Sequence, residues 1–230
     1  MWEQLKSKPA FQILEEMKRT GIVYDMQGNP CPFEDQIDHE SYLALYQIMR
    51  SLKPDMSLEL GFAHGCSTLY MLQGLADNGK GTLISVDSLE LTHYKGGGIK
   101  NIERAGFQHI HKHIILPSQF ALPQLAVQNF KCDFVFIDTS HQFDQTIVES
   151  YYCDKILKVG GIMAFHDYRL LSVKSACNFV ETNLNYRLHP SHSDNLRVIQ
   201  KVGVDDRDKK WYYFVPFEVP KGNQSLRFEI

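Results

Sequence analysis

The sequence lacks the features that mark membrane, secreted and nucleic-acid-binding proteins. Its 230 residues contain no apolar run near the ~20 residues that a membrane-spanning helix needs, and the first residues alternate charge and bulk unlike a signal peptide. The five cysteines are odd in number and form no CxxC pair, so neither a disulfide framework nor a zinc knuckle is expected. With 24 Lys and Arg against 27 Asp and Glu, the formal charge of −3 offers no basic surface for a nucleic-acid backbone. These absences predict a cytoplasmic protein without a nucleic-acid or membrane partner.

The order of apolar runs indicates a single α/β domain, for which 230 residues are long enough. From about Ser57 onward, short apolar runs alternate with helix-like stretches, which is typical of parallel strands joined by right-handed crossovers. Near the end, YRLHPSH and LRVIQKV are separated by only a short turn at Ser193–Asn195, which allows only a hairpin. We therefore predict a doubly wound, mostly parallel seven-stranded sheet with a C-terminal antiparallel strand.

The residues before this alternation form a separate group. Two helical patterns, Trp2–Arg19 and His39–Ser51, are separated by GIVYDMQGNPCPFEDQ, whose Gly, Asn and Pro residues forbid a continuous helix. We predict an N-terminal helical cap over residues 1–54 and a main domain over residues 55–230. The aromatic run WYYFVPFEV is expected to add an edge strand or to pack as a tail, and a homodimer is compatible with such surfaces.

Candidate ligand-binding residues stand where the predicted strands end, because ligands of open α/β sheets lie beyond the carboxyl ends of the strands. The first strand continues as SLELGFAHGCST, with glycines at 61 and 65 only. A dinucleotide fingerprint needs the denser G-x-G-x-x-G, and Glu59 at this position suits a cationic amino group better than a phosphate. Asp87 ends the next strand and can accept hydrogen bonds from ribose hydroxyls. A nucleoside joined to a cationic amino acid, S-adenosylmethionine, fits both features.

Four segments in order carry a family resemblance: LELGFAHGCST, ISVDS, LPSQFALPQL and CDFVFIDTSHQFD…ILKVGGIMAFHDY. Over roughly Met56 to Val202 the sequence resembles the class I S-adenosylmethionine-dependent methyltransferases. The resemblance is to the group of small-molecule O-methyltransferases that includes the catechol and macrocin enzymes. It implies transfer of a methyl group to a hydroxyl of a small molecule, as in secondary metabolism, with S-adenosylmethionine as cofactor.

The resemblance also implies roles for individual residues. The expected cofactor-binding residues are Glu59, Gly61, Gly65, Ser67, Asp87, Ser118, Gln119 and Asp138. The expected ligands of a divalent cation (Mg²⁺, Mn²⁺ or Fe²⁺) are Asp138, His166 and Asp167. Where the catechol enzymes have two oxygen ligands, this chain has His166 first, so either the ion is a borderline one such as Mn²⁺ or Fe²⁺, or His166 does not bind it. His141 stands where those enzymes have a lysine. His141 and His166 are the candidate general bases, with an ordinary pKa of ~6.5.

Two other functions remain open from the sequence. A metal-dependent hydroxylase-like enzyme on the same fold would use the His166-Asp167 pair with iron, and a non-catalytic S-adenosylmethionine-binding domain would act through a partner. The strand-end acids also have a plain interpretation as caps of the helices that follow them. The identity of the acceptor, the need for a metal and the oligomeric state are not fixed by residue types.

Overall fold

The computed structural model describes residues 5–33, 35, 37–210 and 212–220. The elements follow the predicted alternation of strand and helix. The helices are α2 (Pro9–Thr20), α3 (His39–Leu52), α4 (Cys66–Asn78), α5 (Gly97–Arg104), α6 (Ser118–Val127), α7 (Phe143–Ile156), α8 (Leu171–Asn183) and the 3-10 turn η1 (Arg207–Lys209). The strands are β1 (Ile22–Tyr24), β2 (Pro30–Pro32), β3 (Met56–Leu60), β4 (Thr82–Val86), β5 (His111–Ile114), β6 (Cys132–Ile137), β7 (Leu157–Phe165), β8 (Tyr186–Leu188) and β9 (Arg197–Lys201).

Seven strands form the central sheet, in the order β5-β4-β3-β6-β7-β9-β8. Strands β3 to β7 are parallel, whereas β9 pairs antiparallel with both β7 and β8. The predicted fold class is confirmed, including the hairpin that the short turn before β9 required. Strand order reverses direction between β3 and β6, the point at which an open α/β sheet offers a crevice to ligands.

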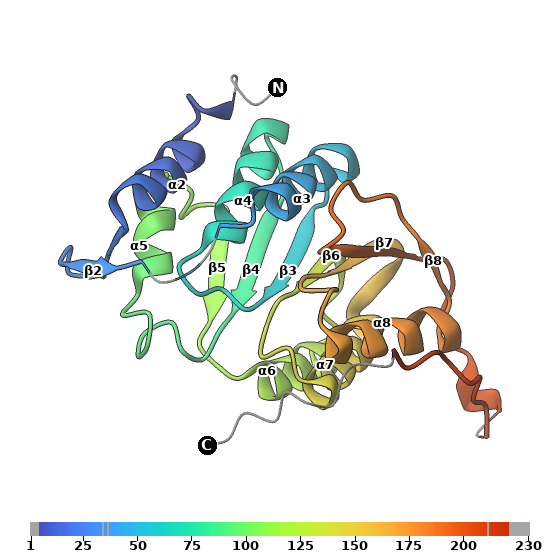
Figure 1. Cartoon of the computed structure of the whole chain (residues 1–230). Helices are drawn as coiled ribbons and strands as arrows, with labels where there is room; N and C mark the ends of the chain where they lie inside the picture. Colours follow the sequence, from blue (N-terminus) through green and yellow to red (C-terminus); the bar gives the residue numbers. More distant parts are fainter. Residues whose placement is uncertain (1–4, 34, 36, 211, 221–230) are drawn as a thin grey trace, which may run out of the picture.

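Helices cover both faces of the sheet: α2, α3, α4 and α5 lie on one side, and α6, α7 and α8 on the other (Figure 1). Alternate residues of each strand supply the two hydrophobic cores. In β6, Phe134 and Phe136 pack with the first group of helices, while Val135 and Ile137 pack with the second. This two-residue period explains why residues 134–137 of the strand (FVFI), buried on both faces, form one unbroken apolar run.

The N-terminal segment is built more closely into the molecule than a detached cap. Buried residues of α2 and α3, including Phe11 and Leu45, belong to the same hydrophobic cluster as α4 and the strands. The small hairpin of β1 and β2 was not expected, because Pro30 and Pro32 signal a turn more strongly than a strand.

The C-terminal aromatic run forms a tail rather than an edge strand over residues 212–220; Trp211 lies outside the described residues. The tail is attached to α8, where the side chain of Asn183 bonds both the N–H and the carbonyl of Val215. No helix in the described part of the chain is long and apolar enough to cross a membrane.

Candidate functional site

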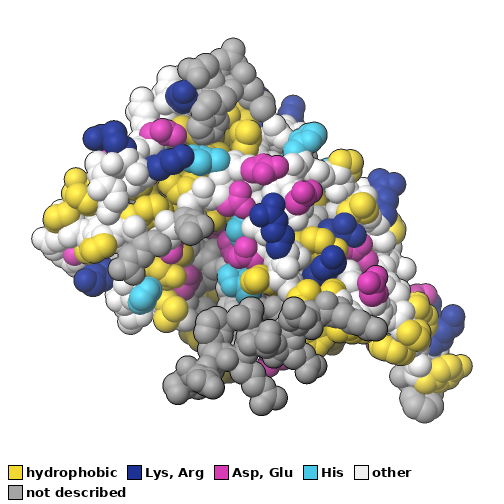
Figure 2. Space-filling view, viewed as in Figure 1, with side chains coloured by type: hydrophobic (Ala, Val, Ile, Leu, Met, Phe, Trp, Pro, Cys, Tyr) yellow, Lys and Arg dark blue, Asp and Glu magenta, His cyan; other side chains and the backbone are white. Residues whose placement is uncertain are grey.

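A cavity of about 1030 Å³ lies at the carboxyl ends of the parallel strands, where the switch in strand order places it. The space-filling view shows acidic and histidine side chains gathered near the middle of this face (Figure 2). The predicted site residues that line the cavity are Gly61, Ser67, Asp87, Ser118, Gln119, Asp138, His141, His166 and Asp167. Most of the side chains singled out in the sequence thus come together.

The glycine loop connects β3 to α4 through two positive-φ glycines. Gly61 has φ +91°, and a Cβ built on it would lie 1.8 Å from the carbonyl oxygen of Asp138. Gly65, with φ +76°, is the N-cap of α4. Only glycine fits at position 61, because any side chain would collide with the end of β6. The close approach holds the loop and Asp138 on neighbouring walls of one cavity.

Glu59 lies beneath the glycine loop instead of lining the cavity. Its carboxylate is fully buried and accepts hydrogen bonds from Ser67 (2.6 Å), Thr68 (2.7 Å) and Ser85 (2.6 Å). Burial raises the pKa of Glu59 to about 7, although these hydroxyl donors act in the opposite direction. Glu59 therefore does not line the cavity where a cofactor amino group was expected to meet it, whereas Ser67, which donates to it, does.

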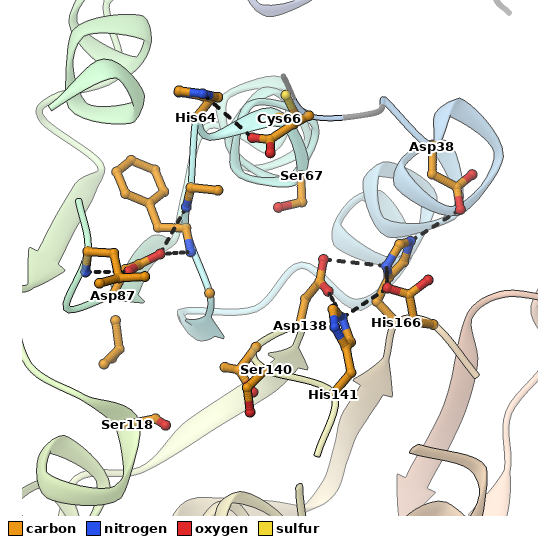
Figure 3. Close-up of a pocket in the computed structure, with 18 of the residues that line it drawn as sticks. Asp38, His64, Cys66, Ser67, Asp87, Ser118, Asp138, Ser140, His141 and His166 are labelled. Atoms are coloured by element: carbon orange, nitrogen blue, oxygen red, sulfur yellow. Dashed lines mark hydrogen bonds and ion pairs between the residues drawn. The ribbon is translucent and has the colours of Figure 1, made fainter. Parts of the chain in front are cut away.

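Asp87 holds the glycine loop from the end of β4. One carboxylate oxygen accepts the backbone N–H groups of Phe62 (2.9 Å) and Ala63 (3.0 Å), and the other accepts the N–H of Leu89 (2.8 Å) (Figure 3). Asp87 also lines the cavity, where its carboxylate can accept further hydrogen bonds, as expected for ribose hydroxyls.

Ser118 and Gln119 begin α6 on the opposite wall from the acidic cluster. Ser118 donates to the buried carboxylate of Glu149 (2.6 Å), and Gln145 donates to Ser118 (2.8 Å) and Gln119 (3.3 Å). Thr139, beside Asp138, donates to the second oxygen of Glu149 (2.9 Å). Glu149 thus connects the start of α6 to the loop after β6. This role was not expected, because Glu149 lies within an ordinary helical pattern.

Asp138, His141 and Asp167 form the polar centre of the cavity. The Nε2 atom of His141 lies 3.1 Å from Asp138 Oδ1 and 2.9 Å from Asp167 Oδ2. His141 and Asp167 have positive φ angles of 58° and 53°, conformations that non-glycine residues adopt at a cost and that recur at functional sites. The loops after β6 and β7 are therefore held in strained shapes that turn these side chains toward one another.

His166 lies behind this centre and is only 7% exposed. Its Nδ1 atom is 3.4 Å from Asp138 Oδ2 and 3.3 Å from Asp167 Oδ2, and its Nε2 atom is 3.2 Å from Asp38 Oδ2. Asp38 comes from the N-terminal segment, and Asn195 bridges Asp38 (3.2 Å) and Asp167 (3.0 Å). Neither Asp38 nor Asn195 was expected as a site residue, because each is far along the chain from the strand ends.

The acids and histidines of this cluster shift one another's pKa values. The hydrogen bond to Asp138, and next that to Asp167, raise the pKa of His141 to about 9. Burial lowers the pKa of His166, but the same two carboxylates outweigh it and raise the value to about 10. Burial likewise opposes the lowering of the Asp138 pKa by the two histidines. The expectation that these histidines titrate near 6.5 is wrong, since both are charged at neutral pH in this arrangement.

The donor set fits a small divalent cation. One ligand atom each of Asp138, His141 and Asp167 lies within 4.8 Å of the others. The protonated rings of His141 and His166 together carry two positive charges, the same charge as one divalent cation. The buried Nδ1 of His166 makes no hydrogen bond of good geometry, so a further donor is turned toward the same place. Carboxylate oxygen with imidazole nitrogen suits borderline ions better than Mg²⁺.

The comparisons with known proteins agree with the fold. A family model described as a methyltransferase domain matches residues 58–168. The structure of cofactor-bound Rv0187 from MTB superposes with a TM-score of 0.65 at 14% identity, over 86% of this chain and 94% of that one. An O-methyltransferase from Bacillus cereus in complex with SAH gives a TM-score of 0.61 at 15% identity, over 84% and 90%.

A third structure is TomG, an O-methyltransferase from Streptomyces achromogenes involved in tomaymycin synthesis, in complex with SAM. It gives a TM-score of 0.61 at 16% identity, over 84% of this chain and 88% of that one. No curated protein matches the sequence. The family match includes the glycine loop, strand β4 with Asp87, and the acidic ends of β6 and β7. The fold agrees with this match over most of the chain. Residues 58–168 therefore match a methyltransferase domain, and most of the chain shares the fold of the three structures.

Proposed function

We propose that this chain is an S-adenosylmethionine-dependent methyltransferase that acts on a hydroxyl group of a small molecule, with assistance from a divalent cation. The observation that carries the proposal is the cluster of Asp138, His141 and Asp167 in the same cavity as the glycine loop. Two neighbouring parts of the cavity would have different roles. The loop around Gly61 and Asp87 would hold S-adenosylmethionine, and the carboxylates of Asp138 and Asp167 would hold the acceptor oxygen.

Positioning would supply most of the rate, since methyl transfer is an in-line displacement at carbon. S-adenosylmethionine, when bound, supplies an electrophilic methyl group on a sulfonium. In this scheme the acceptor hydroxyl lies against Asp138 and Asp167 and gives its proton to Nε2 of His141. The deprotonated oxygen would then form the new bond to the methyl carbon, and the electrons of the broken S–C bond would remain on sulfur.

His141 must be neutral to accept that proton. With a pKa of about 9, only a small fraction of His141 is neutral at pH 7 in the ion-free arrangement. A cation between Asp138 and Asp167 would compensate the carboxylate charges, bring the His141 pKa back toward its ordinary value and acidify the hydroxyl. We therefore assign Asp138, Asp167 and His166 as ligands of the ion and His141 as the base. His141 is also the better exposed of the two histidines.

In this proposal residues 1–54 act as a cap over the acceptor half of the cavity, and residues 55–230 form the catalytic domain. Asp35, Ile37, Glu40 and Tyr42 of this segment line the cavity. Acceptor shape would therefore be selected largely by the cap.

Cofactor binding is the first test. S-adenosylmethionine and its demethylated product are titrated by calorimetry into chelator-treated protein, and again into Asp87→Ala. We expect micromolar binding that Asp87→Ala weakens by at least tenfold, because the variant loses both the ribose acceptor and the anchor of the glycine loop. Failure of both nucleosides to bind wild-type protein, with and without Mn²⁺, would refute the assigned cofactor site.

Turnover tests the base. With a panel of catechols, phenols and sugar hydroxyls as acceptors and Mn²⁺ present, His141→Ala should lower kcat roughly 100-fold or more. His113→Ala is the matched control, since His113 lies on the edge strand β5 and does not line the cavity. Equal turnover of His141→Ala and His113→Ala would remove His141 from the mechanism.

A further inference from the structure

His166 differs from an ordinary strand-end histidine, because aromatic rings contact its imidazole and a carboxylate faces each of its nitrogens. Tyr42 of α3 lies against one face, with ring centroids 5.5 Å apart and planes tilted by 32°, and Phe136 meets the ring at 6.1 Å in an edge arrangement. The side chain is only 8% exposed. These contacts favour the ring orientation seen in Figure 3.

The two nitrogens of His166 meet different surroundings. Nε2 forms a hydrogen bond with Asp38 Oδ2 at 3.2 Å. Nδ1 is buried, lies 3.3–3.4 Å from the carboxylates of Asp167 and Asp138, and makes no hydrogen bond of good geometry. With an ion between Asp138 and Asp167, a single proton on the ring is more stable on Nε2, where Asp38 accepts it, and the lone pair then belongs to Nδ1.

Asp38 is itself held in place by four contacts. As N-cap of α3 it accepts the Ser41 N–H (3.1 Å) on Oδ1, while Oδ2 accepts the Ser41 hydroxyl (2.7 Å), His166 Nε2 (3.2 Å) and Asn195 Nδ2 (3.2 Å). Asn195 also donates to Asp167 (3.0 Å), so the cap carboxylate and the strand-end carboxylate share one amide. The carboxylate of Asp38 cannot turn away from His166 without breaking the N-cap.

We propose that Asp38 is a positioning residue of this site: it keeps the ring proton of His166 on Nε2 and so presents the Nδ1 lone pair to the ion held by Asp138 and Asp167. This inference rests on the proposed metal-assisted function, which it deepens. Metal-binding histidines ordinarily donate their second nitrogen to a carboxylate or carbonyl, which fixes ring and tautomer. Here that partner comes from the N-terminal cap, so the cap completes the ion site as well as covering the cavity.

Asp38→Asn tests the inference with little risk to the fold, because Asn is as good an N-cap as Asp. If the amide oxygen keeps the Ser41 N–H, the amide nitrogen faces His166 Nε2 and donates to it. The ring proton must then move to Nδ1, where it competes with the ion. The matched control is Ser41→Ala, which removes one hydroxyl from Asp38 but leaves its carboxylate on His166 and keeps the backbone cap.

Two measurements on the full chain decide the matter. Mn²⁺ is titrated into chelator-treated wild type, Asp38→Asn, Ser41→Ala and Asp167→Ala, by calorimetry and by loss of the free-ion EPR signal. Nitrogen-15 NMR of histidine-labelled protein loaded with diamagnetic Zn²⁺ reports whether His166 Nε2 carries a proton, the signal being assigned by its loss in His166→Gln. Thermal unfolding of each variant verifies that it is folded.

We expect Mn²⁺ binding to weaken roughly 10- to 100-fold in Asp38→Asn and less than threefold in Ser41→Ala. We also expect a protonated Nε2 in the wild type. Unchanged Mn²⁺ affinity in Asp38→Asn, or a wild-type Nε2 without a proton, would overturn the role of Asp38. Mn²⁺ binding that is absent from the wild type, or equal in wild type and Asp167→Ala, would instead refute the metal-assisted function, an outcome distinct from unchanged affinity in Asp38→Asn alone.

Discussion

Replacement of Gly61 by alanine should damage both stability and chemistry, because the added methyl group collides with the backbone that carries Asp138. The Cβ would lie 1.8 Å from the Asp138 carbonyl oxygen and 2.7 Å from its carbonyl carbon, whereas contacts below 3.0 Å are essentially never observed. The ends of β3 and β6 must then separate by about 1.2 Å, the difference between 3.0 and 1.8 Å. The hydrogen bond from Asp138 N–H to Leu60 (2.9 Å) resists that separation.

The expected magnitude follows from two costs. Alanine at a left-handed φ costs about 1–2 kcal/mol, and overpacking against fixed backbone costs roughly 1–3 kcal/mol more. Gly79→Ala is the matched control: Gly79 has φ +69° as the C-cap of α4, and its Cβ would meet nothing within 4 Å. The control should therefore show the first cost alone. A displacement of ~1 Å at a reacting group is also expected to lower turnover by about 100-fold.

Urea unfolding of the two variants measures the stability difference, and calorimetric titration of S-adenosylmethionine and Mn²⁺ measures the state of the site. We expect Gly61→Ala to lose about 1–3 kcal/mol more than Gly79→Ala and to bind the cofactor and the ion more weakly. Equal unfolding free energies for the two variants, with ligand binding unchanged, would refute the close approach of β3 and β6 as the reason for glycine at position 61.

Two further predictions concern buried carboxylates. Because burial raises the pKa of Glu59 from 4.5 to about 7, the folded state retains a proton that the unfolded chain releases; stability should fall by about 3 kcal/mol as pH rises from 4.5 to 7. Glu59→Gln should flatten this profile in urea unfolding at pH 5 and pH 8, and a wild-type profile that does not fall would contradict the raised pKa. Asp77 binds Lys8 (2.9 Å) and Tyr46 (2.9 Å), and these bonds, against the effect of burial, lower its pKa. Its contribution should be present at neutral pH and lost as pH falls through that lowered value; Asp77→Asn should cost about 1 kcal/mol at pH 7. Asp55→Asn, which disrupts an exposed ion pair, is the control and should cost clearly less; an equal cost would rule out the Asp77 contacts as the cause.

The fold could be predicted largely from local patterns because each pattern reports its own surroundings. Residues 134–137 (FVFI) are apolar throughout because this part of β6 is buried on both faces, and the short turn before β9 leaves only an antiparallel pairing. The β1–β2 hairpin escaped prediction because three-residue strands bounded by proline have no periodicity to read. The aromatic run near the C-terminus satisfied strand propensity, yet it pairs with side chains of α8 rather than with the sheet.

The sequence by itself determined which residues stand at the carboxyl ends of the strands, since those positions follow from where each apolar run stops. Asp87, Asp138 and His166-Asp167 meet at one cavity because parallel strands end at one edge. Only the tertiary structure decided what these residues can do. It placed Glu59 beneath the loop, and it raised the histidine pKa values by enclosing the rings with carboxylates. It also brought Asp38 to His166 across 128 positions of sequence. Charge, burial and hydrogen-bond partners depend on such long-range contacts, and no local pattern records them.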